Sequence, residues 1–237
     1  MYIRFYISKF FYSTFLLFFI ASNAFAEKSI TCATTHYPPY TIFDESTSSF
    51  TGLDMDIINP LFEQLNLKLK VINLPWARLK REIKNNKYDC YFSLGKFQDR
   101  EVFLDYPTTP THITKIALFY PAQQGHIDFE NKVIGVHRGI NNYKDISSSY
   151  GLDLSTIHKL PTNEVLFQML HSNRINAVVT SKVVGEFILK THYPAFDVNT
   201  VEVKEYRLPV YVAFKKGIIE MKLVNEALHN LKTNIQN

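Results

Sequence analysis

The sequence predicts an α/β fold with two lobes, built on largely parallel sheets. Segments with the pattern of buried strands alternate with segments of helical spacing along most of the 237 residues. Two polar breaks, near Gly125 and near Lys204, bracket a middle block with its own strand–helix–strand set. We therefore expect lobe 1 to comprise residues 27–113 and 206–237, and lobe 2, inserted into it, to comprise residues 114–205.

The first 26 residues have the features of a secretory signal peptide. Arg4 and Lys9 are the only charged residues before Glu27, and they flank or precede an apolar run over 10–20. Small residues at 24 and 26 suit a signal peptidase, and the apolar run is too short for a stable membrane span. We predict export to the periplasm with cleavage after Ala26. An uncleaved amino-terminal anchor is the alternative.

The charge balance of the mature chain gives no reason to expect nucleic-acid binding. Removing the signal peptide takes away two of the 26 Lys and Arg residues and none of the 22 Asp and Glu residues. The formal net charge therefore falls from +4 to +2. No arginine-rich run or basic face accompanies this small excess, which excludes a typical nucleic-acid partner.

The two cysteines, Cys32 and Cys90, each lie inside a predicted strand. They form no CxxC pair or Cys/His cluster, and the histidines are scattered, so we expect neither a metal site nor a cofactor. Two buried cysteines on neighbouring strands are the preferred interpretation. A disulfide stays open, because an oxidising compartment permits one.

The predicted elements follow in a regular order along the chain. Strands are expected at 29–34, 67–74, 88–93, 115–120, 132–136, 177–180, 202–203 and 210–214. Helices are expected from about 54, over 75–85, from 141 or 142, over 163–173 and 182–190, and at the carboxyl terminus around 223–231.

The helix near Asp54 contains one unfavourable residue, Pro60. Apolar residues at 53, 57, 61 and 65 would share one face of a continuous helix. Either the helix is kinked at Pro60, or its regular part starts with Asn59 as the cap and the proline in the first turn.

A single arginine, Arg100, follows the strand over 88–93. Loops at the carboxyl ends of strands are where α/β proteins bind ligands. The planar guanidinium can pair with both oxygens of a carboxylate at once, so Arg100 is a candidate for binding one. The alternative is a surface residue joined to Asp99 and Glu101 by weak ion pairs.

Six motifs in this order resemble the family 3 extracellular solute-binding proteins, the periplasmic amino-acid-binding components of ABC importers. They are Tyr37-Pro38-Pro39-Tyr40, Gly52 to Ile57, Pro75-Trp76-Ala77-Arg78, Asp89 to Arg100, Ile134 to Gly139, and Arg174 to Thr180. The resemblance covers about residues 30–232, and the Pro-Trp-x-Arg form is similar to a poorly characterised branch of the family. It implies a type II periplasmic binding fold, in which two doubly wound lobes, joined by two crossing strands, close on a ligand.

The resemblance also implies a ligand site. Its members would be Tyr37, Tyr40, Trp76, Arg78, Ser93, Gly95, Arg100, Ile140, Asn141 and Ser181. Arg100 would bind the ligand's carboxylate, and the amides around Ile140 and Asn141 would meet it at a helix amino terminus. The carbonyl and hydroxyl of Ser93 would meet the ammonium group.

Four of these residues have a plain structural alternative. Tyr37 and Tyr40 match aromatic positions that pack on the ligand, but they would also suit a rigid aromatic turn over the core. Trp76 matches a tryptophan near the cleft, although a lone Trp at a helix start is often a core residue. Arg78 reaches either the cleft or solvent.

The departures from the family pattern bear on the ligand. Relatives that bind α-amino acids usually have an acidic residue where this chain has Ser181, and Gly95 and Phe97 replace hydroxyl residues common before Arg100. An ammonium closed into the cleft without a carboxylate partner would be costly to desolvate. We therefore expect a small carboxylate or a modified amino acid.

The leading hypothesis is a monomeric periplasmic solute-binding protein, not an enzyme, that serves an ABC permease. One alternative is a stand-alone sensory or scavenging module with the same site. Another is a dehydratase of prephenate-like acids, which the same fold supports. A dehydratase needs a positioned acid or base, and the motif loops offer no convergent pair, only the separate residues Asp44, Glu45, Asp99, His36 and His137.

Overall fold

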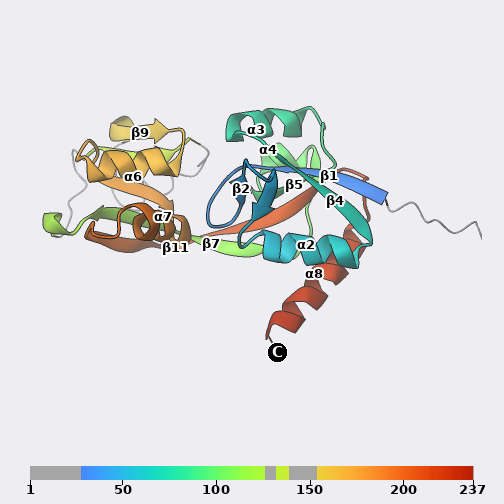
Figure 1. Cartoon of the computed structure of the whole chain (residues 1–237). Coiled ribbons are helices and arrows are strands. Elements are labelled where there is room, and N and C mark those ends of the chain that lie inside the picture. Colours follow the sequence, from blue (N-terminus) through green and yellow to red (C-terminus); the bar gives the residue numbers. More distant parts are fainter. Residues whose placement is uncertain (1–27, 126–131, 139–153, 237) are drawn as a thin grey trace, which may run out of the picture.

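The computed structural model describes residues 28–125, 132–138 and 154–236. The predicted signal peptide, the helix expected from 141 or 142, and the site residues Ile140 and Asn141 lie outside the described residues. Figure 1 shows two bodies joined by the long strands β7 and β11, which agrees with the predicted two-lobed α/β fold.

The first body, lobe 1, holds the amino-terminal elements and the last helix. These are β1 (Lys28–Thr34), β2 (Ile42–Asp44), β3 (Ser49–Thr51), α2 (Met55–Gln64), β4 (Leu67–Asn73), α3 (Trp76–Lys84), β5 (Cys90–Gly95), α4 (Gln98–Glu101), β6 (Leu104–Asp105) and α8 (Met221–Gln236). The second body, lobe 2, holds the elements in between. These are η1 (Ala122–Gln124), β8 (Ile134–His137), η2 (Leu154–Thr156), β9 (Ile157–Leu160), α6 (Asn163–His171), β10 (Ala177–Ser181) and α7 (Lys182–His192).

One sheet runs through both lobes, in the order β4-β1-β5-β11-β7-β10-β8-β9. In this sheet, β1 pairs in parallel with β4 and β5 in lobe 1, and β8 pairs in parallel with β9 and β10 in lobe 2. The connecting strands β7 (His112–Pro121) and β11 (Val198–Lys215) run antiparallel to each other and to their neighbours. The sheet is therefore mixed, not largely parallel as expected, because β7 leads into lobe 2 and β11 returns from it.

The return strand β11 was expected as two separate strands, at 202–203 and 210–214. It is one element of 18 residues. Its first residues pair with the last part of β7, and its residues 207–210 pair with the first part of β7. The register shifts between Glu202 and Arg207, so the polar break near Lys204 marks an irregularity inside a continuous strand. The proposed lobe boundaries at 113/114 and 205/206 stay a prediction.

Both faces of the lobe 1 sheet are buried. On one face, side chains of β1, β5 and β11 pack against α2 and α8, and on the other the alternate residues pack against α3. Cys32 of β1 packs in the cluster on the α2 and α8 side, whereas Tyr91 of the neighbouring β5 packs in the cluster on the α3 side.

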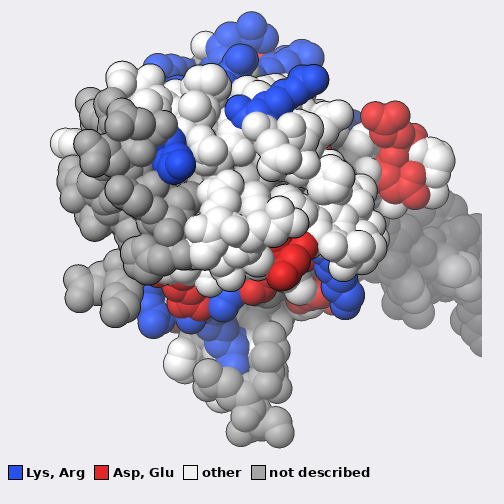
Figure 2. Space-filling model, turned by 90° about the vertical axis from the view of Figure 1, so that its left-hand side faces the viewer, with Lys and Arg blue, Asp and Glu red and all other residues white. Residues whose placement is uncertain are grey.

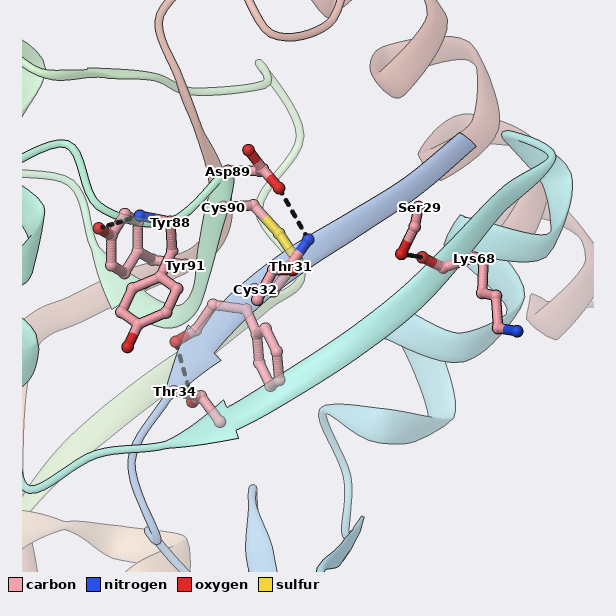
Figure 3. Close-up of a disulfide and its surroundings, with 10 residues drawn as sticks. Ser29, Thr31, Cys32, Thr34, Lys68, Tyr88, Asp89, Cys90 and Tyr91 are labelled. Atoms are coloured by element: carbon pink, nitrogen blue, oxygen red, sulfur yellow. Dashed lines mark hydrogen bonds between the residues drawn. A yellow bond between two sulfur atoms is a disulfide. The ribbon is translucent and has the colours of Figure 1, made fainter. Parts of the chain in front are cut away.

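The two cysteines are register partners on β1 and β5 and form a disulfide (Figure 3). Both are fully buried. The prediction of buried cysteines on neighbouring strands is confirmed, and the open question of a bond has a positive answer. Beside the bond, the Asp89 carboxylate accepts a 2.8 Å hydrogen bond from the Thr31 amide, which ties the start of β5 to β1.

Helix α2 begins at Met55 and contains Pro60, so Asn59 is not its cap. The buried face of this helix shares only Leu61 with the apolar face expected at 53, 57, 61 and 65. It consists of Met55, Ile58, Leu61 and Phe62, whereas Leu53 precedes the helix and is 48% exposed. The short hairpin β2–β3 and strand β9 were not predicted, because their sequences lack a strand-like apolar pattern.

Basic side chains gather along the exposed side of α3 and just after it. Arg78, Arg81, Lys84 and Lys87 are all exposed, and Figure 2 shows such a group at the top of the molecule. The sequence reading found no basic face, so it missed this cluster. Within the described residues, no helix is both long and apolar enough to cross a membrane.

Lobe 2 packs α7 tightly against β7, and Gly185 is the contact point. A Cβ atom at this position would meet the ring of Phe119, with Cε1 only 2.8 Å away. Phe119 is fully buried and packs against Phe167 of α6, so its ring has little room to move. Only glycine fits at 185 without displacing this aromatic pair.

We expect Gly185→Ala to destabilise the protein by about 1–3 kcal/mol, because overpacking forces a buried ring out of place. Urea unfolding measures the loss. The same substitution in a Phe119→Leu background should cost clearly less, and an equal cost in both backgrounds would contradict the proposed clash.

Candidate functional site

A cavity of about 540 Å³ lies between the two lobes. Its wall comes from the segments that follow β1, β4 and β5 in lobe 1, from the start of β7 and the middle of β11, and from the segments at the ends of β8 and β9 in lobe 2. Because the parallel strands of each lobe end at the same sheet edge, these loops converge. The volume suits a small molecule.

Arg100, on the short helix α4, is buried and lines the cavity. One guanidinium nitrogen, Nη1, donates to the carbonyl of Gly95 at 2.7 Å. The guanidinium carbon lies 5.1 Å from the ring centroid of Trp76 and 4.8 Å from that of Phe97. Burial lowers its pKa.

The surface alternative for Arg100 does not fit this placement. Glu101 pairs with Lys96 at 3.1 Å, and Arg100 forms no ion pair within the described part of the chain. A buried cation with most of its donors unused is costly unless an anion joins it. The cavity wall therefore carries a buried positive charge that no described residue neutralises by an ion pair.

Trp76, at the first position of α3, also lines the cavity. Its indole Nε1 is buried and has no hydrogen-bond partner among the described residues. Buried donors are nearly always paired in folded proteins. The Trp76 N–H is thus an exception among the described residues, on a ring that lies against Arg100.

Tyr37 and Tyr40 line the cavity and bring the lobes together. Their rings stack 5.9 Å apart, and the Tyr40 ring stacks on His112 at 4.2 Å. Tyr40 packs with buried residues of lobe 2, and its hydroxyl lies 3.2 Å from Thr114 Oγ1. Burial raises the pKa of Tyr37 above its ordinary value. Tyr37 and Tyr40 thus form an aromatic cluster and also face the cavity, so the turn interpretation and the ligand-contact interpretation are compatible.

Ser93 lines the cavity, but its hydroxyl is engaged inside the protein. It donates to Oδ2 of Asp54, a carboxylate that is 1% exposed. Nδ1 of His112 lies 2.8 Å from Oδ1 of the same carboxylate. Oδ1 nevertheless accepts no hydrogen bond of good geometry from the described residues. Ser93 also has a φ of 57°, an uncommon value for serine that the surrounding contacts must maintain.

Asp54 and His112 were missed at the sequence level. Asp54 was expected at the start of a helix, whereas His112 precedes the strand expected at 115–120 and fell in no predicted element, so the two share no motif. Ser93 and Asp54 are 39 positions apart and meet only through the fold. Because Nδ1 of His112 faces Asp54, Nε2 is the ring nitrogen left for the cavity that His112 lines.

Lobe 2 contributes the end of β8 and the amino terminus of α6. His137 and Glu164 both line the cavity, and burial lowers the pKa of His137. Thr162 caps α6 by accepting from the amide of Val165 at 3.2 Å. The side chain of Asn163 accepts from Thr180 Oγ1 at 2.7 Å, which fixes the helix start to β10.

Two predicted site residues lie away from the cavity wall. Ser181 is buried, with its hydroxyl 2.7 Å from Thr114 Oγ1, and does not line the cavity. Arg78 has a side chain that is 52% exposed and lies 3.6 Å from a carboxylate oxygen of Glu82. The structure thus places Ser181 in the packed interior and Arg78 on the basic side of α3.

Gly95 lines the cavity, and its Cα lies close to the ring of Phe97. A Cβ at Gly95 would come within 2.8 Å of the Phe97 ring, so a hydroxyl residue could not stand there beside this phenylalanine. The two departures from the family pattern therefore depend on each other. Within the described residues, no group of three or more His, Cys, Asp or Glu side chains is arranged to hold a metal ion.

Comparison with known proteins places these features in a family. The model of the bacterial extracellular solute-binding proteins, family 3, matches residues 30–236. A probable histidine-binding protein of Neisseria gonorrhoeae is 23% identical over 203 residues, covering 83% of this chain and 75% of that protein. A cyclohexadienyl dehydratase of Pseudomonas aeruginosa is 24% identical over 200 residues, covering 78% and 72%.

The fold is also similar to that of solved structures. An ancestral arginine-binding protein bound to arginine matches with a TM-score of 0.73 and 22% identity, over 87% of this chain and 93% of that one. The motif order, the two-lobed fold with its crossing strands and the family match agree. The chain belongs to the bacterial extracellular solute-binding proteins of family 3.

Proposed function

We propose that this protein captures a small, amino-acid-like solute through its carboxylate, in the cavity between the lobes. The observation that carries the proposal is Arg100 on the cavity wall. It is a buried cation without an anionic partner in the described chain. A carboxylate is the group that matches its planar fork of donors.

The solute would act as a bridge between the lobes. Residues of both lobes line the cavity, and the amides near Ile140 and Asn141 are proposed to join them at the carboxylate. A ligand that contacts both lobes stabilises the closed arrangement relative to an open one, with β7 and β11 as the connection. Closure would then present the loaded protein to an ABC permease in the inner membrane.

The names of the relatives agree with this reading. A histidine-binding protein and an arginine-binding protein share the family or the fold, and both names refer to amino acids. A periplasmic location, reached through cleavage of the predicted signal peptide after Ala26, is part of the proposal.

Isothermal titration calorimetry on the mature protein tests the proposal. Each candidate amino acid is paired with the amine that lacks its carboxylate, such as L-histidine with histamine and L-arginine with agmatine. We expect at least one carboxylate to bind and its paired amine to bind at least about 30-fold more weakly, because a lost partner for a buried charge costs roughly 2–5 kcal/mol. Equal binding of both members of every pair, or of neither, would refute the carboxylate site.

A dehydratase is the second candidate function, and one observation favours it. His112 lines the cavity, and its Nδ1 lies 2.8 Å from the buried carboxylate of Asp54, so a histidine beside a carboxylate faces the space where a general acid or base would act. A relative is a cyclohexadienyl dehydratase. Loss of the ring hydroxyl as water, together with loss of the ring carboxylate as CO2, would convert a prephenate-like cyclohexadienol acid into an aromatic product that absorbs in the ultraviolet. Turnover by the wild type that His112→Gln abolishes would establish this function, and no turnover would dispose of it.

A further inference from the structure

We infer that Glu164, at the start of α6, selects solutes that carry a positive charge by binding their cationic group across the cavity from Arg100. The inference rests on the proposed function, since it presumes a solute whose carboxylate lies at Arg100. It assigns the role to a residue outside the motifs that resemble the family. It also changes the expected ligand from a plain carboxylate to one that has a cationic group as well.

Glu164 is the one carboxylate among the described residues that line the cavity. Asp54 lies behind the wall, is 1% exposed, and is held by Ser93 and His112. Position 181, where relatives that bind α-amino acids usually have an acid, is a serine whose hydroxyl is hydrogen-bonded to Thr114 in the packed interior. A cationic group in this cavity therefore has Glu164 as its available partner in the described chain.

The Glu164 carboxylate is also uncommitted. It makes no ion pair and no side-chain hydrogen bond with any described residue, although it is half-buried. Arg138, which also lines the cavity from lobe 2, donates from Nε to the carbonyl of Lys159 at 3.1 Å. An acid left without a partner at a cavity wall is available to a ligand.

The electrostatic neighbours of Glu164 place it where the lobes meet. Burial is the main cause that raises the pKa of Tyr37, and the charge of Glu164 adds to it. Burial lowers the pKa of His137, and Glu164 opposes that effect. Tyr37 belongs to lobe 1 and His137 to lobe 2, so the carboxylate acts on both sides of the cavity.

A purely local role for Glu164 is the competing explanation. Acidic residues in the first turn of a helix interact favourably with its positive end, and Glu164 occupies the first turn of α6. That role requires only the charge and predicts a small loss of stability on neutralisation. It predicts no change in which solutes bind, and this difference separates the two explanations.

The test compares wild type with Glu164→Gln, which keeps the size of the side chain and removes its charge. The probes form matched sets: L-arginine, its analogue without the α-amino group (5-guanidinopentanoate), and its analogue without the guanidinium group (L-norvaline), with corresponding sets built on L-histidine and L-lysine. Calorimetry measures each dissociation constant. Comparison within a set shows which cationic group contacts Glu164.

We expect Glu164→Gln to weaken binding of the preferred cationic solute by about tenfold or more, as for loss of a charge-assisted hydrogen bond. Binding of the analogue that lacks the contacted cation should change less than about twofold. The matched control is Glu186→Gln on α7 of the same lobe, whose carboxylate is exposed and only weakly paired with Lys182 at 3.8 Å. It should leave all affinities unchanged.

The outcomes separate this inference from the proposed function. If carboxylates bind but Glu164→Gln affects charged solutes and their uncharged analogues alike, the inference is wrong and the carboxylate site stands. If no carboxylate in the sets binds to the wild type, both are wrong. Thermal melting of the variants identifies the local role, since a loss of stability without a change in selectivity supports the helix-terminus explanation instead.

Discussion

Replacing Arg100 by glutamine should weaken carboxylate binding by roughly 2–5 kcal/mol, that is, about 30-fold to several thousand-fold. Arg100 is buried between the rings of Trp76 and Phe97, and it spends one donor on the Gly95 carbonyl. The remaining donors form a planar fork that matches two carboxylate oxygens. Glutamine removes both the charge and the fork. Calorimetry with the best carboxylate from the paired titrations measures the effect.

Arg100→Lys and Arg78→Gln are the informative companions. Lysine keeps the charge but not the bidentate geometry, so its affinity should lie between those of the wild type and the glutamine variant. Arg78 is exposed on α3 and pairs only loosely with Glu82, so its replacement should change affinity less than about twofold. Unaltered affinity in a folded Arg100→Gln protein would mean that the carboxylate binds elsewhere.

The part of the site that could be predicted from the sequence is the part carried by contiguous motifs. Tyr37 and Tyr40 follow β1, and Arg100 follows β5, at positions where parallel strands end. A strand, a break and a polar residue are all local features, so the sequence shows them. Those three residues line the cavity, together with Trp76, Ser93 and Gly95.

The part that could not be predicted depends on long-range contacts. Asp54, just before α2, and His112, the first residue of β7, meet only in the folded chain, where Asp54 also accepts from Ser93, and no spacing along the sequence predicts that contact. Glu164 has a different difficulty. An acid in the first turn of a helix is common for local reasons, so the sequence offers no sign that this one faces a cavity.

The errors in the fold prediction have a similar origin. A polar break near Lys204 indicated the end of an element, but β11 continues through it because pairing with β7 supplies backbone partners on both sides of the irregularity. Likewise, a place for Ser181 in the ligand site was inferred from its position directly after the strand expected at 177–180. The side chain instead turns into the interior, where Thr114 provides a hydrogen bond.

Removing the disulfide should produce the largest loss of stability in the molecule. Cys32 and Cys90 are 58 positions apart, and closing a loop of that length restricts the unfolded chain by about 4 kcal/mol in the chain-entropy description. Cys32→Ala combined with Cys90→Ala removes that restriction. Urea unfolding of the double variant and of the wild type, with and without reductant, measures the change.

The wild type unfolded in reductant should behave like the double variant, and unfolded without reductant it should expose no reactive thiol. Two reactive thiols in the unfolded, unreduced protein would contradict the bond.

Solute affinity gives the contrasting readout. The bond joins β1 and β5 within the sheet, whereas Tyr37 and Arg100 lie beyond the carboxyl ends of those strands. Because packing on both faces of the sheet still holds the two strands in register, the double variant should bind solute within a fewfold of the wild type under conditions where it remains folded. A loss of affinity as large as that of Arg100→Gln would instead mean that the bond itself determines the geometry of the cavity.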